Sequence, residues 1–300
     1  MLGTLIGDII GSVYEFKNLR RKDFEPLFHP QARFTDDTVC TVAVAVADAL
    51  VRGTDPQATL IDWCRRYAEN GGWGKRFALW FMDDDPQPYG SWGNGAAMRI
   101  SPVGLLASSE DEAIAWADAA TTITHNHPDG IASARAVALA VFWARQKVAA
   151  PDIATRLTER FGYHLNTTPD DIRPTYIRTE SAPGSVPQAL VCALQSSSYE
   201  DAIRTAVSIG GDSDSIAAIA GGIAEVSFRL SWQESMKALF RLGAKRYPCA
   251  IYLPQMLRRL ACSFAATRFT IARGVRVDAS GTNHCAAVAL ASDSCIRCDS

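Results

Sequence analysis

The chain has 300 residues, of which 48% are hydrophobic and 21% are charged, and its formal net charge is -2. The apolar content is ample for a folded core and excludes a disordered chain, while the near-neutral charge lacks the basic face that DNA or RNA binding needs. No run of about eighteen apolar residues is present to cross a membrane.

The start of the chain predicts no targeting segment. It is apolar, but it lacks a basic region and carries Asp8 and Glu15, which do not fit a secretory signal peptide. The eight cysteines have irregular spacing, and several lie inside apolar helical runs, which is typical of reduced thiols. We therefore expect a cytoplasmic protein.

Helices dominate the predicted elements along the chain. Apolar residues recur at steps of three and four, and convincing alternating strands are nearly absent. The central segments are rich in Ala and Gly, which favours close helix–helix contact, so we expect an all-α fold that forms a compact helical bundle. Asp55, Ser109 and Ser231 are plausible helix caps. The periodic segments cover 55–70, 109–124, 129–147, 150–162, 185–195, 199–210 and 231–247.

The end of the chain differs in character from the rest. We expect one helical domain over 1–265 and a tail over 266–300, where the helical signal is weak. Cys295 and Cys298 have the C-x-x-C spacing of zinc ligands and, with His284 and Cys285, offer a zinc set. One such pair without a second favours a loosely ordered tail over a zinc site.

Two expected helix starts carry more carboxylates than a cap needs. Thr35, Asp36, Asp37 and Thr38 precede one apolar helical run, and an Asp-Ser-Asp-Ser segment at 212–215 precedes another. A Thr or Asp at a helix start satisfies free N–H groups, which explains one acid at each place. Crowded carboxylates repel one another unless cations neutralise them, and oxygen ligands suit Mg²⁺, Mn²⁺ or Ca²⁺. From spacing alone, metal binding and double capping remain equal alternatives.

Five motifs occur in an order that is typical of one family. They are GTLIGDIIGSVYEF, FTDDT, GSWGNGAAMR, THNHPDG and GGDSDSIAAIAGGIAE, and they lie within about residues 1–260. On these motifs the chain resembles the ADP-ribosylglycohydrolases, which include dinitrogenase reductase-activating glycohydrolases and ADP-ribosylhydrolases. The resemblance implies the orthogonal helical bundle of that family, with a two-metal centre.

The resemblance also implies which residues act at that centre. Glu15, in an apolar run that contains glycines, and Asp37 are the expected catalytic residues. Glu15 suits a general acid or base, while Gly7 and Gly11 in the same run also suit plain helix packing. Ser215 stands where the family usually has Thr and keeps the hydroxyl. Two divalent cations, Mg²⁺ or Mn²⁺, are expected on Thr35, Asp36, Asp37, Asp212, Asp214 and Ser215.

A glycine-flanked loop and a histidine are the expected substrate-binding residues. Backbone N–H groups in such a loop can approach a phosphate closely, although Gly93 and Gly95 also suit ordinary turns. Trp92 and Tyr89 suit either stacking on adenine or ordinary packing, and His127 suits a helix cap. By the same resemblance, the residues near ADP-ribose are Ser91, Trp92, Gly93, Asn94, Gly95, Thr124 and His125.

The function that the resemblance implies is hydrolytic removal of ADP-ribose from a modified acceptor. An ADP-ribosylated protein is the expected partner, with an arginine linkage preferred, and ADP-ribose is the product; nucleic acid enters only as a modified substrate. Two alternatives stay open, namely another metal-dependent phosphoester hydrolase and a non-catalytic ADP-ribose-binding member of the same fold. The presence of Glu15 and of all four aspartates argues against the non-catalytic member.

Overall fold

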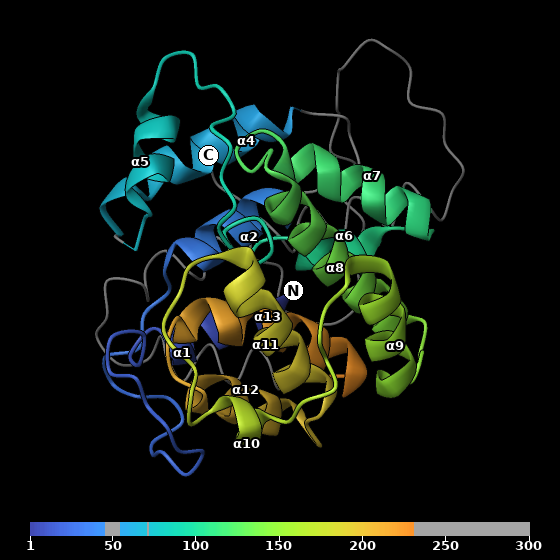
Figure 1. Ribbon diagram of the computed structural model, residues 1–300. Helices are drawn as coiled ribbons and strands as arrows, with labels where there is room; N and C mark the ends of the chain where they lie inside the picture. The colour runs from blue at the N-terminus through green and yellow to red at the C-terminus, as the bar shows by residue number, and fades with distance from the viewer. Residues whose placement is uncertain (46–54, 71, 231–300) are drawn as a thin grey trace, which may run out of the picture.

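The computed structural model describes residues 1–45, 55–70 and 72–230, which are folded mainly into α-helices (Figure 1). These ranges contain no β-strand, and a single isolated bridge joins Gly93 to Ser181. The predicted all-α fold is confirmed. Nor do these ranges hold a helix that is both long and apolar enough to cross a membrane. The elements are α1 (Leu2–Gly11), α2 (Asp36–Ala45), α4 (Pro56–Arg66), η1 (Ala68–Asn70), α5 (Lys75–Met82), α6 (Ser101–Leu106), α7 (Glu110–Thr121), α8 (Pro128–Arg145), α9 (Ala150–Phe161), α10 (Pro169–Ile172), α11 (Ala182–Leu194), α12 (Tyr199–Ser208) and α13 (Ser213–Ser227).

Local signals start several helices where the sequence predicts. The side chains of Asp55 and Ser109 accept a backbone N–H at the first turns of α4 and α7, as caps do. His127 caps α8 in the same way, which is the role that the sequence favoured for it. The helix expected over 231–247 with its cap Ser231, the domain boundary at 265–266, and the zinc set His284, Cys285, Cys295 and Cys298 lie outside the described residues.

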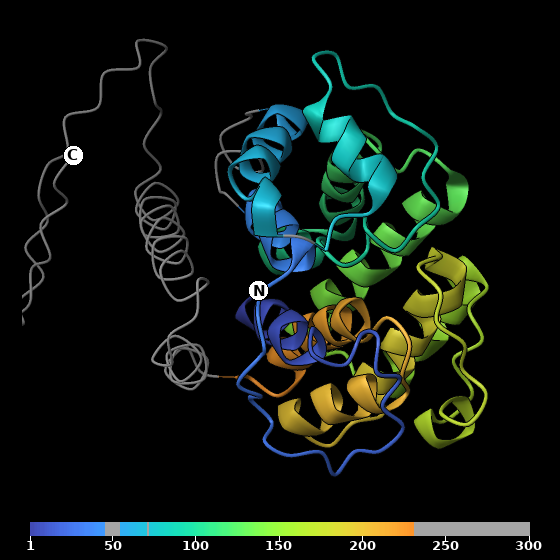
Figure 2. The same ribbon diagram turned by 90° about the vertical axis from the view of Figure 1, so that its left-hand side faces the viewer.

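Helix α13 is central to the packing. It lies against α1 and also contacts α8, α11 and α12 (Figure 1). Figure 2 shows the dark blue α1 beside the orange α13 in a second view, so the two ends of the described chain meet. The opening segment of the sequence and the late acidic segment therefore lie side by side.

Glycines set the distance between α1 and α13. A Cβ on Gly7 would lie 2.1 Å from the carbonyl oxygen of Ala217, and a Cβ on Gly11 would lie 2.4 Å from that of Ser213. Real Cβ atoms do not approach a backbone oxygen so closely, so only glycine lets the two backbones touch here. The packing role that the sequence offered for Gly7 and Gly11 is thus present, and it fixes Asp8 of α1 close to the start of α13.

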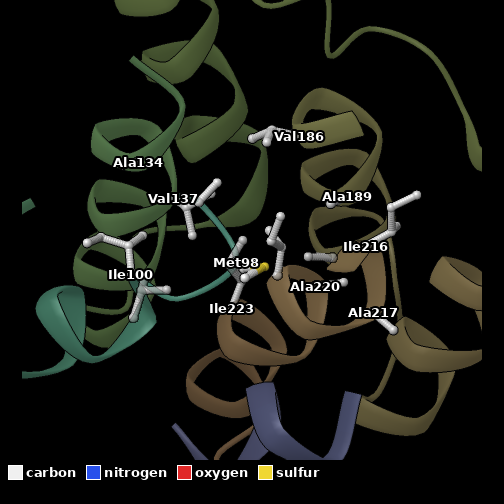
Figure 3. Packing of buried hydrophobic residues seen from close by; sticks show 14 of the residues in the cluster. Met98, Ile100, Ala134, Val137, Val186, Ala189, Ile216, Ala217, Ala220 and Ile223 are labelled. Atoms are coloured by element: carbon white, nitrogen blue, oxygen red, sulfur yellow. The ribbon is translucent and has the colours of Figure 1, made fainter. Parts of the chain in front are cut away.

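Small apolar side chains fill the space between α8, α11 and α13. Figure 3 shows Val137 of α8, Val186 of α11 and Ile216 of α13 in one buried cluster with Met98 and Ile100. All five are buried. Alanines separate them along the three helices and let the backbones approach, which confirms the close contact that the Ala-rich segments predict. A tightly packed frame of this kind holds the helix starts in fixed positions.

Candidate functional site

The two acidic segments meet at the starts of α2 and α13. The hydroxyl of Ser215 lies 3.4 Å from Asp37 Oδ2, and the hydroxyl of Thr35 lies 3.5 Å from the same oxygen. Asp212 and Asp214 are buried with them. The structure therefore brings together residues from distant parts of the chain, as the sequence predicts.

Asp8 on α1 is an acidic residue of the same cluster that the sequence analysis did not assign. Its carboxylate is fully buried and accepts hydrogen bonds from the backbone N–H and the hydroxyl of both Thr35 and Thr38. All four donors belong to the first turn of α2 or to the residue before it, so Asp8 caps that helix from a neighbouring one. The available signal was an acid inside an otherwise apolar helical run.

Capping does not account for the remaining aspartates. Asp212 occupies the cap position of α13, but its side chain makes no capping hydrogen bond. Asp37 Oδ1 is buried and has no hydrogen-bond partner at all. A buried carboxylate oxygen without a partner is costly, which favours a cation over double capping as the reason for these acids.

The carboxylates form two sets of three that share one residue. Asp8, Asp37 and Asp214 make the inner set, and Glu15, Asp212 and Asp214 make the outer set. In each set one oxygen per residue lies within 4.8 Å of the others. Oxygen-only donors so arranged suit hard divalent cations such as Mg²⁺ or Mn²⁺, so the residues present fit a metal centre.

Burial and mutual repulsion disfavour the charged form of these acids. Burial, and next the charge of Asp214, holds the pKa of Asp37 well above its usual range. The pKa of Asp214 is likewise raised by burial and next by Asp212. Burial raises the pKa of Asp8 to about 6 and that of Asp212 to about 6, although hydrogen-bond donors oppose both shifts. A bound cation would relieve this cost, because it stabilises the ionised carboxylates.

Asp36, which the sequence predicts as a ligand, stands beside the two sets and belongs to neither. It is half-buried at the first position of α2. A Cβ on Gly72 would lie 2.6 Å from Asp36 Oδ1, so the segment after η1 closes over this carboxylate. Its role as a ligand stays a prediction.

Glu15 lies just beyond the end of α1, at the mouth of the cluster. Its side chain is 16% exposed, and it accepts a hydrogen bond of 2.7 Å from Arg178 Nη2. The sequence predicts apolar surroundings for Glu15, whereas in the structure its neighbours include this arginine and two aspartates. The difference arises because the segment before α11 folds back onto the end of α1, a tertiary contact that no local pattern indicates.

The loop from Ser91 to Gly95 is tied to the cluster through Asn94. Its side-chain amide donates to Asp212 Oδ2 over 2.6 Å and to the Ser185 hydroxyl over 3.1 Å. The backbone of the loop pairs with residues 180–182, and Trp92 projects from it with 54% of its surface exposed. The predicted substrate loop therefore lines the edge of the acidic cluster.

His125 is buried on the other side of this loop. Its Nδ1 lies 2.7 Å from the Thr124 hydroxyl, to which Arg99 Nη2 also donates. Burial and then the charge of Arg99 hold the pKa of His125 well below its usual range, so the imidazole stays neutral. A Cβ on Gly95 would lie 3.1 Å from Nε2, which shows that the loop glycine faces this ring.

Comparison with known proteins decides the family. The family model described as ADP-ribosylglycohydrolase matches residues 1–224. The chain belongs to the ADP-ribosylglycohydrolase family. The predictions of the family and of an ADP-ribosylglycohydrolase enzyme are therefore confirmed.

Relatives of this ADP-ribosylglycohydrolase are about one quarter identical to it over the aligned positions. The ADP-ribosylarginine hydrolase Tri1 of Pseudomonas putida is 24% identical in an alignment of 269 positions that covers 77% of this chain and 70% of the relative. The ADP-ribosylhydrolase ARH3 of Bos taurus is 26% identical in an alignment of 319 positions that covers 78% of this chain and 87% of the relative. A solved structure described as an ADP-ribosylglycohydrolase-related protein complex covers 80% of this chain and 95% of its own, with a TM-score of 0.59 and 22% identity. The last comparison supports the fold.

Proposed function

We propose that this ADP-ribosylglycohydrolase hydrolyses the bond between ADP-ribose and a modified acceptor at a centre that holds two divalent cations. The observation that carries the proposal is the pair of carboxylate sets that share Asp214, together with the unpartnered buried oxygen of Asp37. The expected ligands are the inner set for one cation and the outer set for the other, with the hydroxyls of Thr35 and Ser215 beside them.

Cations at such a centre supply positive charge that holds the vicinal hydroxyls of a ribose and a water molecule. Cleavage of a glycosidic bond passes through an oxocarbenium-like state, which a nearby carboxylate stabilises. Glu15 and Asp37 are the proposed catalytic residues. Glu15 lies at the mouth of the cluster, where it can move a proton to or from water or the leaving group. Asp37 lies deeper, in the inner set, and has one carboxylate oxygen without a hydrogen-bond partner.

The loop Ser91–Gly95 and His125 are proposed to bind the diphosphate and the distal ribose. The backbone N–H groups of Ser91, Gly93 and Asn94 already donate within the protein, so the N–H groups of Trp92 and Gly95 are the ones proposed to meet phosphate oxygens. The neutral imidazole of His125 can accept or donate one hydrogen bond without adding charge. The exposed indole of Trp92 is proposed to stack on the adenine.

An arginine-linked protein is the proposed acceptor. Support comes from the relative in Pseudomonas putida, which is named an ADP-ribosylarginine hydrolase. The bovine relative is named an ADP-ribosylhydrolase, a name that specifies no acceptor. The partner is accordingly an ADP-ribosylated protein, the product is ADP-ribose, and Mg²⁺ or Mn²⁺ is the proposed cation.

The test is release of ADP-ribose from arginine- and serine-modified peptides, with Mg²⁺, with Mn²⁺ or with EDTA. We expect cation-dependent release, faster from arginine, that Asp37→Ala and Asp214→Ala abolish. Asp152→Ala, a change at an exposed aspartate of α9, is the matched control and should retain activity. Full turnover in EDTA would contradict the metal centre. Binding of ADP-ribose without turnover would favour a non-catalytic member, and hydrolysis of simple phosphoesters alone would favour a phosphoester hydrolase.

A further inference from the structure

Arg178 provides the only basic side chain that pairs with either carboxylate set within the described residues. Its Nη2 lies 2.7 Å from Glu15 Oε1 and 3.9 Å from Asp212 Oδ1. Both acids belong to the outer set. No such ion pair reaches Asp8 or Asp37 of the inner set within the same ranges.

The outer set is therefore neutralised in part by the chain itself. The positively charged guanidinium lies near two carboxylates and, like a metal ion, offsets their mutual repulsion, which burial strengthens. It also occupies one of the carboxylate oxygens that a metal ion would need. A cation at the outer set must therefore displace Arg178 from Glu15, whereas a cation at the inner set meets only hydroxyl and backbone N–H donors and displaces no ion pair.

Arg178 has other interaction partners that remain when its contact with Glu15 is broken. Its Nη1 donates to Glu180 Oε1 over 3.0 Å, and its guanidinium lies 4.9 Å from the centre of the Phe16 ring. Glu180 is exposed, Phe16 is 78% exposed, and the arginine side chain is itself 35% exposed. Residues 176–180 form no helix or strand. A small rotation of the side chain thus exchanges the buried partners for solvent-exposed ones.

We propose that Arg178 is an internal counter-ion that competes with the second divalent cation for Glu15 and Asp212. The inference rests on the two-cation centre of the proposed function. It makes the affinities of the two cation sites unequal, because no basic side chain competes for the inner set, whereas the outer set binds an ion only as Arg178 withdraws. Arg178 is in this view a positioning residue that acts through Glu15.

The test measures cation binding directly on the full chain after removal of metals with EDTA. Free Mn²⁺ is followed by its electron paramagnetic resonance signal during titration of the wild type, Arg178→Gln and Arg178→Lys. We expect two classes of site in the wild type, and in Arg178→Gln a weaker class that tightens by about 10- to 100-fold, a range typical of groups just behind metal ligands. The Mn²⁺ affinity of the tighter class should not change. Arg178→Lys should bind Mn²⁺ like the wild type, because lysine keeps the positive charge.

Thermal unfolding separates competition from a plain structural role. Arg178→Gln should lower the Tm of the EDTA-treated protein, which loses its counter-ion, and should leave the Mn²⁺-saturated protein close to the wild type. Arg135→Gln is the matched control, because Arg135 pairs bidentately with Asp118 on another helix pair and should change both forms equally.

Two results would overturn the proposal. If Arg178→Gln binds the second Mn²⁺ no more tightly than the wild type, the competition is refuted while the two-cation centre stands. If neither protein binds Mn²⁺, the centre of the proposed function fails as well.

Discussion

Asp214 is the one residue that belongs to both carboxylate sets within the described part of the chain, so it should contribute to the binding of both cations. We predict that Asp214→Asn loses both cations, whereas Asp212→Asn loses only the cation of the outer set. Asparagine keeps the shape of the side chain but removes the charge that attracts a metal ion. Activity of Asp214→Asn should fall by more than about a hundredfold, since even groups behind metal ligands are worth about 10- to 100-fold.

The measurement is equilibrium dialysis against Mn²⁺ followed by metal analysis. One bound ion in Asp212→Asn and none in Asp214→Asn is the expected result. Equal numbers of bound ions in the two variants would contradict the shared position of Asp214.

His125 makes stability depend on pH through a pKa that burial lowers. Below the unfolded-state pKa of about 6.5, the unfolded chain binds a proton at this position and the folded chain does not. The free energy of unfolding therefore falls as the pH falls, by up to about 1.4 kcal/mol for each pH unit that lies below this pKa and above the folded one. Above about pH 7 the imidazole is neutral in both states, so this loss of stability is absent.

The prediction is tested by urea unfolding of the wild type and His125→Gln at pH 7.5, 6.5 and 5.5, with EDTA throughout. Other groups titrate in this range, so the difference between the two proteins isolates His125. As the pH falls, we expect the free energy of unfolding of the variant to decrease less than that of the wild type. A difference that stays constant with pH would mean that the imidazole titrates alike in both states.

At the scale of elements, the contact between α1 and α13 positions the centre. Gly7→Ala would place a methyl group against the carbonyl oxygen of Ala217, and the two helices would have to separate. We expect a loss of about 1–3 kcal/mol in the free energy of unfolding, as for other overpacked sites, and weaker Mn²⁺ binding because Asp8 and Asp214 move apart. Urea unfolding and the Mn²⁺ titration measure the two effects.

Gly74→Ala is the matched control for this change. A Cβ on Gly74 would meet no atom within 4 Å, so neither stability nor Mn²⁺ affinity should change by much. Loss of stability without loss of cation binding in Gly7→Ala would show that the helix spacing does not set the geometry of the centre.

Elements and ligands differ in how far the sequence predicts them. Apolar periodicity and caps such as Asp55 and Ser109 suffice for helices, because these signals act within one turn. The paired aspartates within 35–38 and 212–215 also form a local pattern, and this pattern indicates a metal site. The role of Asp8 and the ion pair of Arg178 with Glu15 escape prediction, because both depend on which segments meet in space. The domain boundary and the tail remain predictions.

For the whole molecule, the centre joins parts of the chain that are far apart in sequence. Its ligand sets come from α1, the segment after α1, and the starts of α2 and α13. A cation bound there holds these parts together in the folded state and has no comparable site in the unfolded chain. Binding at about 100 times Kd should add about 2.7 kcal/mol to the free energy of unfolding, which corresponds to a rise in Tm of roughly 5–10 °C.

The measurement is the Tm of the EDTA-treated chain as Mg²⁺ or Mn²⁺ is added at constant ionic strength. We expect a rise for the wild type and none for Asp214→Asn, since the variant lacks the carboxylate common to both sets. KCl at matched ionic strength should give no rise, because screening alone does not bridge the carboxylates. A rise of equal size in Asp214→Asn would place the stabilising ions elsewhere in the chain, and the aspartates at the starts of α2 and α13 would then need another explanation.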